Sequence, residues 1–400
     1  MNPRENPYTP NAGARPPALV GRDRELEAFD VLLERMERGR PQQSMIVTGL
    51  RGVGKTVLLG SFRETAEERG WATVEAEVSH NSDFAGRMAR HARRALLRIA
   101  SADRWKSRAR RAASVLKSFS LTFSPDGSVA AGLDVSALDG AGDSGDLGED
   151  LTDLLVALGE AAKESATGVV FLFDELQFLK REELEALIIA LHKTVQRALP
   201  ITLVGAGLPQ LPRVAGEAKS YSERLFTFPM IGRLSEDDAR RALVVPAADL
   251  GVAFEPLAAA FIVEYTEGYP YFVQEYGNVV WDEAPASPVT LADAQRALPL
   301  VEDKLDESFF RVRADRMTPL ELTYMRAMAE LGPEAQRAGV VAELLSRGVE
   351  QLGPTRSRLI EKGLLYTPGH GLAAFTVPQF DRYLKGNHAL IVPPPRGRSG

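Results

Sequence analysis

Through the first 230 residues, short runs of apolar side chains alternate with longer segments in which apolar residues recur every three or four positions. Three runs have the length of buried strands, 44–48, 168–173 and 201–205, and residues 72–78 alternate as a half-buried strand. Helical periodicity is expected around them, at 23–38, 57–70, 83–100, 151–162 and 181–199. This alternation predicts an α/β fold in which a parallel sheet carries helices on both faces.

The strand signals stop after Leu234, and the pattern changes twice more toward the C-terminus. Four helices are predicted at 235–250, 255–267, 270–283 and 291–313, which makes this part all-helical. The last 80 or so residues then predict three shorter helices at 318–331, 339–347 and 353–363, followed by a hairpin of 364–366 with 373–377.

Residues 101–150 break the alternation and are interpreted as an insertion in the α/β domain. Ser118–Phe123 and 128–134 alternate around Ser124-Pro125-Asp126-Gly127, which predicts a β-hairpin, and Gly140–Gly148 is expected to be mobile. The proline-rich ends, 1–18 and 387–400, are expected to be flexible tails.

Composition narrows the class of protein. The 400 residues are 44% hydrophobic and 26% charged, enough for a large core and two or three domains. The absence of cysteine excludes disulfides, zinc–thiolate sites and thiol catalysis. No apolar run reaches the length of a membrane helix and no secretory signal is evident, so a cytoplasmic protein without a membrane partner is expected.

The clearest chemical signal is Gly49-Leu50-Arg51-Gly52-Val53-Gly54-Lys55-Thr56, placed between a predicted strand and a predicted helix. Glycines let the backbone curl so that its N–H groups point at phosphates, and the helix start adds partial positive charge. Lys55 is suited to the β- and γ-phosphates, and the Thr56 hydroxyl is suited to Mg²⁺. The segment predicts a nucleoside triphosphate site.

A second motif adds carboxylates to this site. The strand Val169–Phe173 ends in Asp174-Glu175, which places both acids at the carboxyl end of a central strand. Asp174 is suited to hold Mg²⁺, and Glu175 to polarise the attacking water as a general base. Either acid alone could instead cap the following helix, but together with the phosphate loop they predict a hydrolytic site.

These motifs, the strand end Val204–Gly207 and the helices after Leu234 resemble an AAA+ ATPase, most closely the origin-recognition-like ATPases and their STAND signalling relatives. Leu19–Leu26 resembles the family's N-terminal signature near the adenine, and Glu267–Phe272 resembles its lid motif. The resemblance implies that ATP or ADP is bound by Val20, Gly21, Arg22, Gly49, Leu50, Arg51, Gly52, Val53, Gly54, Lys55, Thr56, Val57 and Pro270. Arg22 has an alternative role in pairing with Glu25 or Glu27.

The resemblance also implies the division of the chain. It predicts a P-loop ATPase domain at 19–231 that contains the 101–150 insertion, a helical lid at 232–313 and a winged-helix domain at 314–386, with tails at 1–18 and 387–400. Arg224 lies where relatives carry an arginine that contacts nucleotide in a neighbouring subunit, so a homo-oligomer is expected with ATP bound. Equally, Arg224 could be a solvated or salt-bridged side chain.

Two departures from the family predict slow or partner-dependent hydrolysis. Gly205-Ala206-Gly207 offers no polar residue to sense the γ-phosphate, which leaves Thr202 as a weak candidate. The lid helix at 270–283 contains no arginine to contact that phosphate.

The C-terminal helices and hairpin resemble a winged helix, in which the third helix often enters the DNA major groove. Residues 310–400 carry 13 Lys+Arg against 8 Asp+Glu, which favours a polyanion such as duplex DNA. The expected contacts are Arg347, Arg356, Arg358 and Lys362, with His370 nearby. The alternative is a protein–protein module with solvated charges.

A second basic region at 87–117 has 11 Lys+Arg and a single acid. Arg87, Arg90, Arg94 and Arg98 share a helix face, and Trp105 and Phe119 could stack on bases. The alternative is internal pairing with 134–153, which holds seven acids and no base.

The sequence therefore predicts a Mg²⁺-dependent ATPase that is a DNA-associated switch or loader, or alternatively a STAND-like signalling ATPase whose winged helix is a latch.

Overall fold

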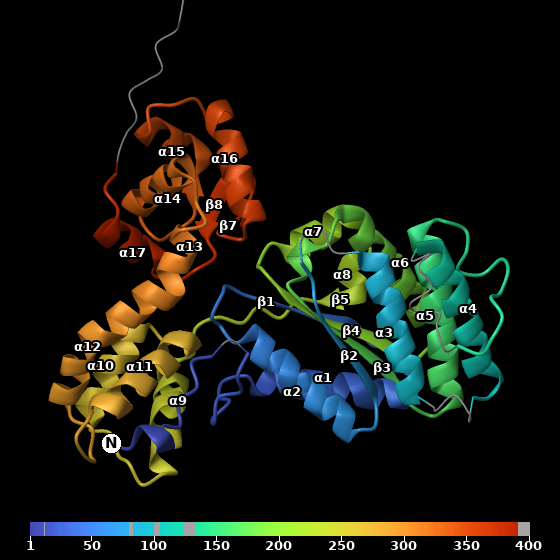
Figure 1. The fold of residues 1–400 in the computed structure, drawn as a ribbon, viewed down its shortest axis with the longest axis horizontal. Coiled ribbons are helices and arrows are strands. Elements are labelled where there is room, and N and C mark those ends of the chain that lie inside the picture. Colours follow the sequence, from blue (N-terminus) through green and yellow to red (C-terminus); the bar gives the residue numbers. More distant parts are fainter. Residues whose placement is uncertain (12, 80–82, 100–104, 124–132, 391–400) are drawn as a thin grey trace, which may run out of the picture.

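The structure is a computed structural model that describes residues 1–11, 13–79, 83–99, 105–123 and 133–390. Figure 1 shows the α/β part on one side of the molecule, with the helices that follow it and the C-terminal segment on the other. No described helix is long and apolar enough to cross a lipid bilayer.

A five-stranded parallel sheet forms the centre of the α/β part. Its strands are β1 (Ser44–Thr48), β2 (Ala72–Glu77), β3 (Val169–Asp174), β4 (Ile201–Gly207) and β5 (Phe226–Thr227), in the order β2-β3-β4-β1-β5. The four strands expected from the sequence are confirmed, and β5 adds a short edge that pairs with β1. Because all strands are parallel, the segments that follow β1 and β3 emerge at the same edge of the sheet.

Helices cover both faces of the sheet, as expected. On one face, α1 (Asp23–Glu37) and α2 (Lys55–Glu68) enclose a core that includes Phe29, Phe62 and Val170. On the other, α3 (Phe84–Ile99), α5 (Leu147–Glu164) and α6 (Arg181–Gln196) pack over Phe171 and Phe173. The short helices η3 (Leu176–Phe178), α7 (Leu211–Ala218) and α8 (Ser222–Leu225) follow the strand ends.

The hairpin predicted around residue 124 is wrong at its first strand, because Ser118–Phe123 form the end of helix α4 (Ser107–Phe123). Phe119 and Phe123 lie one helical turn apart with ring centroids 4.8 Å apart, so their spacing fits a helix as well as a strand. The second predicted strand, 128–134, lies mostly outside the described residues. Residues 140–148 were expected to be mobile. Two of their backbone N–H groups donate to the buried Asp150 carboxylate, and helix α5 begins within this stretch, at Leu147.

Four helices follow the sheet and form the predicted all-helical region, called the lid below: α9 (Glu236–Ala248), α10 (Pro256–Thr266), α11 (Pro270–Glu283) and α12 (Leu291–Leu305). The N-terminal segment, expected to be a flexible tail, packs on this lid instead, with a short helix η1 (Pro3–Glu5). Tyr8 is only 3% exposed, and its hydroxyl donates to the carbonyl of Leu243. Tyr8, a large aromatic residue among 18 mostly small or polar ones, therefore anchors the N-terminal segment to the lid.

The C-terminal segment is joined to the lid through the π-helical turn Asp306–Arg311 and α13 (Val312–Ala314). It comprises α14 (Pro319–Leu331), α15 (Ala338–Leu344), α16 (Val349–Glu361) and α17 (Phe380–Asn387), with a small antiparallel sheet of β6 (Gln336–Arg337), β8 (Leu372–Phe375) and β7 (Leu365–Tyr366). We call residues 314–387 the C-terminal module. The three helices and hairpin expected from sequence are present, while the winged-helix assignment stays a prediction.

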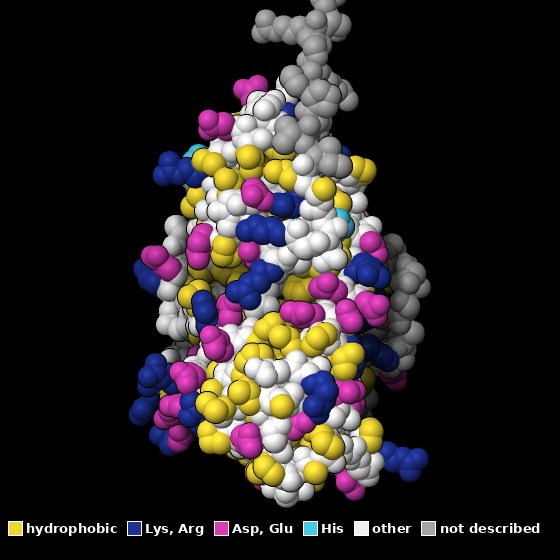
Figure 2. All heavy atoms as spheres, turned by 90° about the vertical axis from the view of Figure 1, so that its left-hand side faces the viewer, with side chains coloured by type: hydrophobic (Ala, Val, Ile, Leu, Met, Phe, Trp, Pro, Cys, Tyr) yellow, Lys and Arg dark blue, Asp and Glu magenta, His cyan; other side chains and the backbone are white. Residues whose placement is uncertain are grey.

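Lid and C-terminal module share one hydrophobic core, so they are mechanically linked. Phe310 connects them, because its ring stacks with those of Phe380 and Tyr383 at centroid distances of 5.9 and 5.3 Å. Figure 2 views this side of the molecule, where Lys and Arg side chains are interspersed with Asp and Glu.

Candidate active site

The phosphate loop connects β1 to α2 in the order expected for a nucleotide site. Gly52 and Gly54 have φ angles of +79° and +92°, conformations that side chains other than glycine rarely adopt. The buried Lys55 ammonium donates to the carbonyls of Gly49 and Leu50 at 3.0 and 2.8 Å. Burial lowers the pKa of Lys55 to about 8, opposed by the nearby Glu175 and Asp174 carboxylates.

The second motif reaches the loop from β3. The Thr56 hydroxyl donates to Oδ2 of Asp174 at 2.6 Å, although the two residues are 118 positions apart in the chain. A hydroxyl and a carboxylate on adjacent elements at the end of a parallel sheet form the oxygen-donor set that Mg²⁺ prefers. Thr56 and Asp174 therefore fit the metal that the phosphate loop implies.

Glu175 lies beside this pair but is held by two neighbours. Its Oε1 accepts a hydrogen bond from Nη1 of Arg51 at 3.0 Å, and its Oε2 accepts one from Gln177. The backbone of Glu175 has a left-handed φ of +56°, which turns the chain from β3 into η3. The carboxylate is thus placed at the catalytic edge of the sheet but committed to an ion pair.

The glycines at the end of β4 make room for this turn. A Cβ atom on Gly205 would lie 2.1 Å from Cδ1 of Leu176, and one on Gly207 would lie 2.5 Å from Oε1 of Gln177. The same Gln177 oxygen accepts the backbone N–H of Leu208 at 3.1 Å. Gln177 therefore connects β4 to Glu175, a role that no sequence motif indicated.

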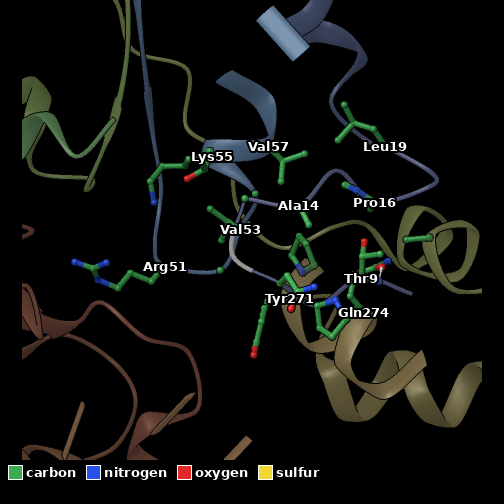
Figure 3. Close-up of a pocket in the computed structure, with 18 of the residues that line it drawn as sticks. Thr9, Ala14, Pro16, Leu19, Arg51, Val53, Lys55, Val57, Tyr271 and Gln274 are labelled. Carbon is green, nitrogen blue, oxygen red and sulfur yellow. Dashed lines mark hydrogen bonds between the residues drawn. The ribbon is translucent and has the colours of Figure 1, made fainter. Parts of the chain in front are cut away.

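A cavity of about 580 Å³ extends from these residues toward the lid. Figure 3 shows that Lys55 and Arg51 lie at one end of it, whereas Leu19, Pro16, Thr9 and Gln274 lie at the other. Val20, Val57 and Pro270 also line this cavity, so a polar end near Lys55 and a more apolar end near Leu19 and Pro16 share one space. These dimensions suit triphosphate at one end and an aromatic base at the other.

Most of the residues predicted to bind nucleotide line this cavity. Those brought together are Val20, Arg22, Arg51, Gly52, Val53, Gly54, Lys55, Thr56, Val57, Asp174, Glu175 and Pro270. Gly21, Gly49 and Leu50 do not line it, although the last two accept hydrogen bonds from Lys55. Sequence reasoning missed the segment Thr9–Ala18, much of which lines the cavity opposite the phosphate loop.

Arg22 does not form the expected ion pair with Glu25 or Glu27. Its guanidinium donates to backbone carbonyls of Val53 at 3.1 Å and Gly232 at 2.7 Å, and it is 8% exposed. Burial lowers the pKa of Arg22, while Glu25 and Asp238 act in the opposite direction. Arg22 therefore fixes the phosphate loop against the chain that enters the lid.

Arg51 joins the phosphate loop to the C-terminal module. Its backbone N–H donates to the carbonyl of Thr376 at 2.9 Å, and its Nε donates to the carbonyl of Gly363 at 3.3 Å. Since its Nη1 also bonds Glu175, one side chain contacts both the Glu175 carboxylate and the turn between α16 and β7. Figure 3 shows Arg51 extending away from the loop on the Lys55 side of the cavity.

Two predicted phosphate-facing residues are not in this site. Thr202 is buried near the start of β4, opposite the catalytic end, where its hydroxyl lies 3.1 Å from that of Ser44. The correction follows from strand direction, since only the carboxyl end of β4 approaches the loop. Arg224 lies exposed on α8, outside its own subunit's cavity, and its role across a subunit interface stays a prediction.

The expected DNA contacts on α16 are turned to internal partners. Lys362 donates to Oε2 of the fully buried Glu321 at 2.7 Å, and Arg358 lies 3.8 Å from Oε1 of the same carboxylate. Arg356 donates to the carbonyl of Leu372 at 2.6 Å. Glu321 follows Thr318 in a helix-capping pair, so a buried acid attracts Arg358 and Lys362. Contact of Arg356, Arg358 and Lys362 with DNA stays a prediction. Arg347 and His370 retain partial or full exposure.

The basic stretch 87–117 matches neither sequence interpretation well. Arg98 lies 3.6 Å from Glu67, and Arg108 lies 2.6 Å from Glu160, so these charges pair with the α/β domain. No ion pair joins this stretch to 134–153 within the described parts of either segment. Trp105 and Phe119 are buried, which removes them as stacking surfaces for bases.

Two parts of the chain match known protein families. Residues 18–204 match the family model of the AAA ATPase domain. This match covers just under half of the chain and identifies the part that carries the phosphate loop as similar to the AAA ATPase domain. It agrees with the strand order, the phosphate loop and the acids at the end of β3. A second model, a domain of unknown function, matches residues 307–384.

Two solved structures show the same fold over nearly the whole chain. A Walker-type ATPase of Pyrococcus abyssi is 15% identical with a TM-score of 0.56, and the match covers 93% of this chain and 97% of that one. The ORC2 protein of Aeropyrum pernix, in complexes with ADPNP and ADP, is 17% identical with a TM-score of 0.51, covering 94% and 96%. No curated protein matches the sequence significantly.

Proposed function

We propose that this AAA+ protein binds ATP with Mg²⁺, hydrolyses it, and uses the bound nucleotide to control the position of its C-terminal module. The observation that carries the proposal is the convergence of Lys55, the Thr56–Asp174 pair and Glu175 on one cavity. The AAA ATPase family match supports nucleotide binding, and the polar and apolar ends of the cavity give the triphosphate and the base separate environments.

Each residue has a separate task in this proposal. Lys55 and the backbone N–H groups of the loop bind the β- and γ-phosphates, and Thr56 with Asp174 holds the metal. When bound, Mg²⁺ neutralises charge that develops on the phosphate oxygens. Glu175 accepts a proton from the attacking water, which requires its carboxylate to be free of competing donors.

The ion pair between Arg51 and Glu175 supports control of turnover. In this arrangement the general base is engaged by Arg51, and Arg51 is itself bonded to the backbone of the C-terminal module at Gly363 and Thr376. Movement of that module would pull Arg51 and release Glu175. Displacement of the module and hydrolysis are thereby coupled through one side chain.

Three variants test the nucleotide part of the proposal. We expect Lys55→Ala to lose ATP affinity by at least about tenfold, because it removes a charge-assisted contact to phosphate. Glu175→Gln should bind ATP as the wild type does and lose turnover, while Asp174→Asn should lose the Mg²⁺ dependence of binding. ATP binding that is unaffected by Lys55→Ala in calorimetry would overturn the proposal.

The partner is a separate question that the same protein can answer. We propose that ATP promotes a homo-oligomer in which the exposed Arg224 of one subunit faces the nucleotide of the next. Duplex DNA stays a candidate partner from the charge of the C-terminal segment, but the engaged bases of α16 favour the latch interpretation of the module. Titration with duplex DNA in ADP, ATP and a slowly hydrolysed analogue, at several salt concentrations, decides between them, since phosphate contacts give a steep salt dependence.

A further inference from the structure

One half-buried cation in the cavity lacks an anionic partner. Arg313 lines the cavity from α13, outside both the phosphate loop and the lid helix α11, which contains no arginine. No carboxylate lies within 4.0 Å of its guanidinium among the residues that the structure describes. Its Nη1 donates a hydrogen bond to the backbone carbonyl of Phe309.

The guanidinium is held in place by an aromatic stack. Its Cζ lies 4.1 Å from the centre of the Phe309 ring, and that ring stacks on Tyr271 with a centroid distance of 4.7 Å. Tyr271 in turn contacts the phosphate loop, because its backbone N–H donates to the carbonyl of Gly52 at 3.2 Å. The stack therefore fixes Arg313 next to the loop at low conformational cost.

The electrostatic surroundings of Arg313 are unfavourable for a cation. Burial lowers the pKa of Arg313 to about 10, and the neighbouring Arg51 and Arg316 act in the same direction, with Tyr271 opposing them. A buried charge without a counterion is costly unless a ligand supplies the opposite charge. Two arginines that converge on the phosphate end of a cavity create a positive potential that suits a polyanion.

We propose that Arg313 binds the terminal phosphate of ATP from the wall opposite Lys55 and distinguishes ATP from ADP. The inference rests on the nucleotide site proposed above. Position favours the terminal phosphate, because Arg313 and Arg51 line the same cavity and Arg51 bonds the Glu175 carboxylate that would face the attacking water.

This assignment also places phosphate recognition in an unexpected part of the chain. Ser308, Phe309 and Arg313 line the cavity but belong to the segment 307–384, which matches the domain of unknown function and not the ATPase model. Arg313 is followed directly by the helices of the C-terminal module, so a contact with phosphate would pull on that module without an intermediate element.

The test compares three variants of the full chain by calorimetric titration with Mg²⁺ and either ADP or a slowly hydrolysed ATP analogue. Arg313→Met preserves an apolar chain over the Phe309 ring, Arg313→Lys preserves the charge, and Arg316→Met removes an exposed arginine three residues away that does not line the cavity. We expect Arg313→Met to weaken the analogue about 10- to 100-fold, the range for a charge-assisted hydrogen bond, and ADP less than threefold. Arg313→Lys should be intermediate, and Arg316→Met should stay within twofold.

Thermal unfolding of the nucleotide-free variants separates binding from packing. Because Arg313→Met removes an uncompensated cation, its midpoint should equal or exceed that of the wild type. A lower midpoint, an equal loss of affinity for ADP and the analogue, or unchanged affinity for the analogue would each overturn the role of Arg313. Failure of the wild type to bind the analogue would instead overturn the proposed function itself.

Discussion

Replacement of Arg51 by methionine is expected to increase ATP turnover, although Arg51 lies in the phosphate loop. The substitution removes the hydrogen bonds to Glu175 and to the carbonyl of Gly363, while the backbone bond to Thr376 can persist. Glu175 then remains bonded to Gln177 alone. The general base should become available without displacement of the C-terminal module.

The size of the effect follows from the ion pair. Hydrogen bonds to charged groups contribute about 1.5 to 3 kcal/mol net. The Arg51 and Glu175 side chains are 24% and 19% exposed, so solvent screens the pair only partly and the lower half of that range is appropriate. Since each 1.36 kcal/mol changes a rate about tenfold, this half of the range, about 1.5 to 2.25 kcal/mol, should raise kcat by roughly 13- to 45-fold.

Steady-state kinetics over a range of ATP concentrations separates release of the base, seen in kcat, from loss of binding, seen in KM. KM should increase, because a cation that lines the cavity is lost, while kcat should rise. Arg213→Met is the matched control, since Arg213 forms an exposed pair with Glu217 on α7 and should leave both constants unchanged. The double variant Arg51→Met/Glu175→Gln should be inactive. A kcat that is unchanged or lower in Arg51→Met, or that stays elevated in the double variant, would refute the reasoning.

Three further predictions concern assembly, the C-terminal module and the N-terminal segment. Arg224→Ala should bind ATP normally and lose the concentration dependence of turnover; turnover that depends on protein concentration as in the wild type would argue against a role between subunits. Lys362→Met should lower the free energy of unfolding by about 1 to 3 kcal/mol, because it leaves buried Glu321 short of a donor, whereas Arg358→Met should cost less than about 1 kcal/mol. Burial alone would raise the pKa of Glu321, but hydrogen bonds from Lys362 and Thr318 outweigh burial and hold that pKa below 4.5. The ionised Glu321 therefore stabilises the fold above pH 4.5, and this contribution is lost as the pH falls below that value. Glu321→Gln should weaken the loss of unfolding free energy at acid pH in urea titrations, and an unaltered loss would contradict the assignment. Tyr8→Ala should destabilise the lid by about 3 kcal/mol and Tyr8→Phe by about 1 kcal/mol in the same assay, and equal effects would mean that the hydroxyl, not the ring, is the anchor.

The sequence predicted those features that depend on neighbours along the chain. Apolar runs located β1, β3 and β4, because strands buried on both faces are mostly apolar, and alternation located the half-buried β2. The phosphate loop and Asp174-Glu175 were recognisable because each is a contiguous segment whose chemistry requires fixed spacing. Their convergence within 2.6 Å followed from the rule that parallel strands present their carboxyl ends at one edge.

Contacts between distant segments were not predictable in the same way. Gln177 and Arg313 belong to no motif, and their positions depend on β4 and on the π-helical turn after the lid. The bases of α16 looked available for DNA because the buried carboxylate that engages them, Glu321, lies about 40 residues earlier and is itself part of a helix cap. Tyr8 seemed to belong to a tail because its partners on the lid lie more than 230 residues away.

The two glycines at the end of β4 constrain how this site could change. A side chain at Gly205 would collide with Leu176, and one at Gly207 would collide with the amide of Gln177 that reaches Glu175. A polar sensor introduced there would therefore have to displace the side chain of Leu176 or the Gln177 amide that donates to Glu175. Nucleotide discrimination can be altered more readily at Arg313, because this residue lines the cavity from α13, an element that is separate from the sheet.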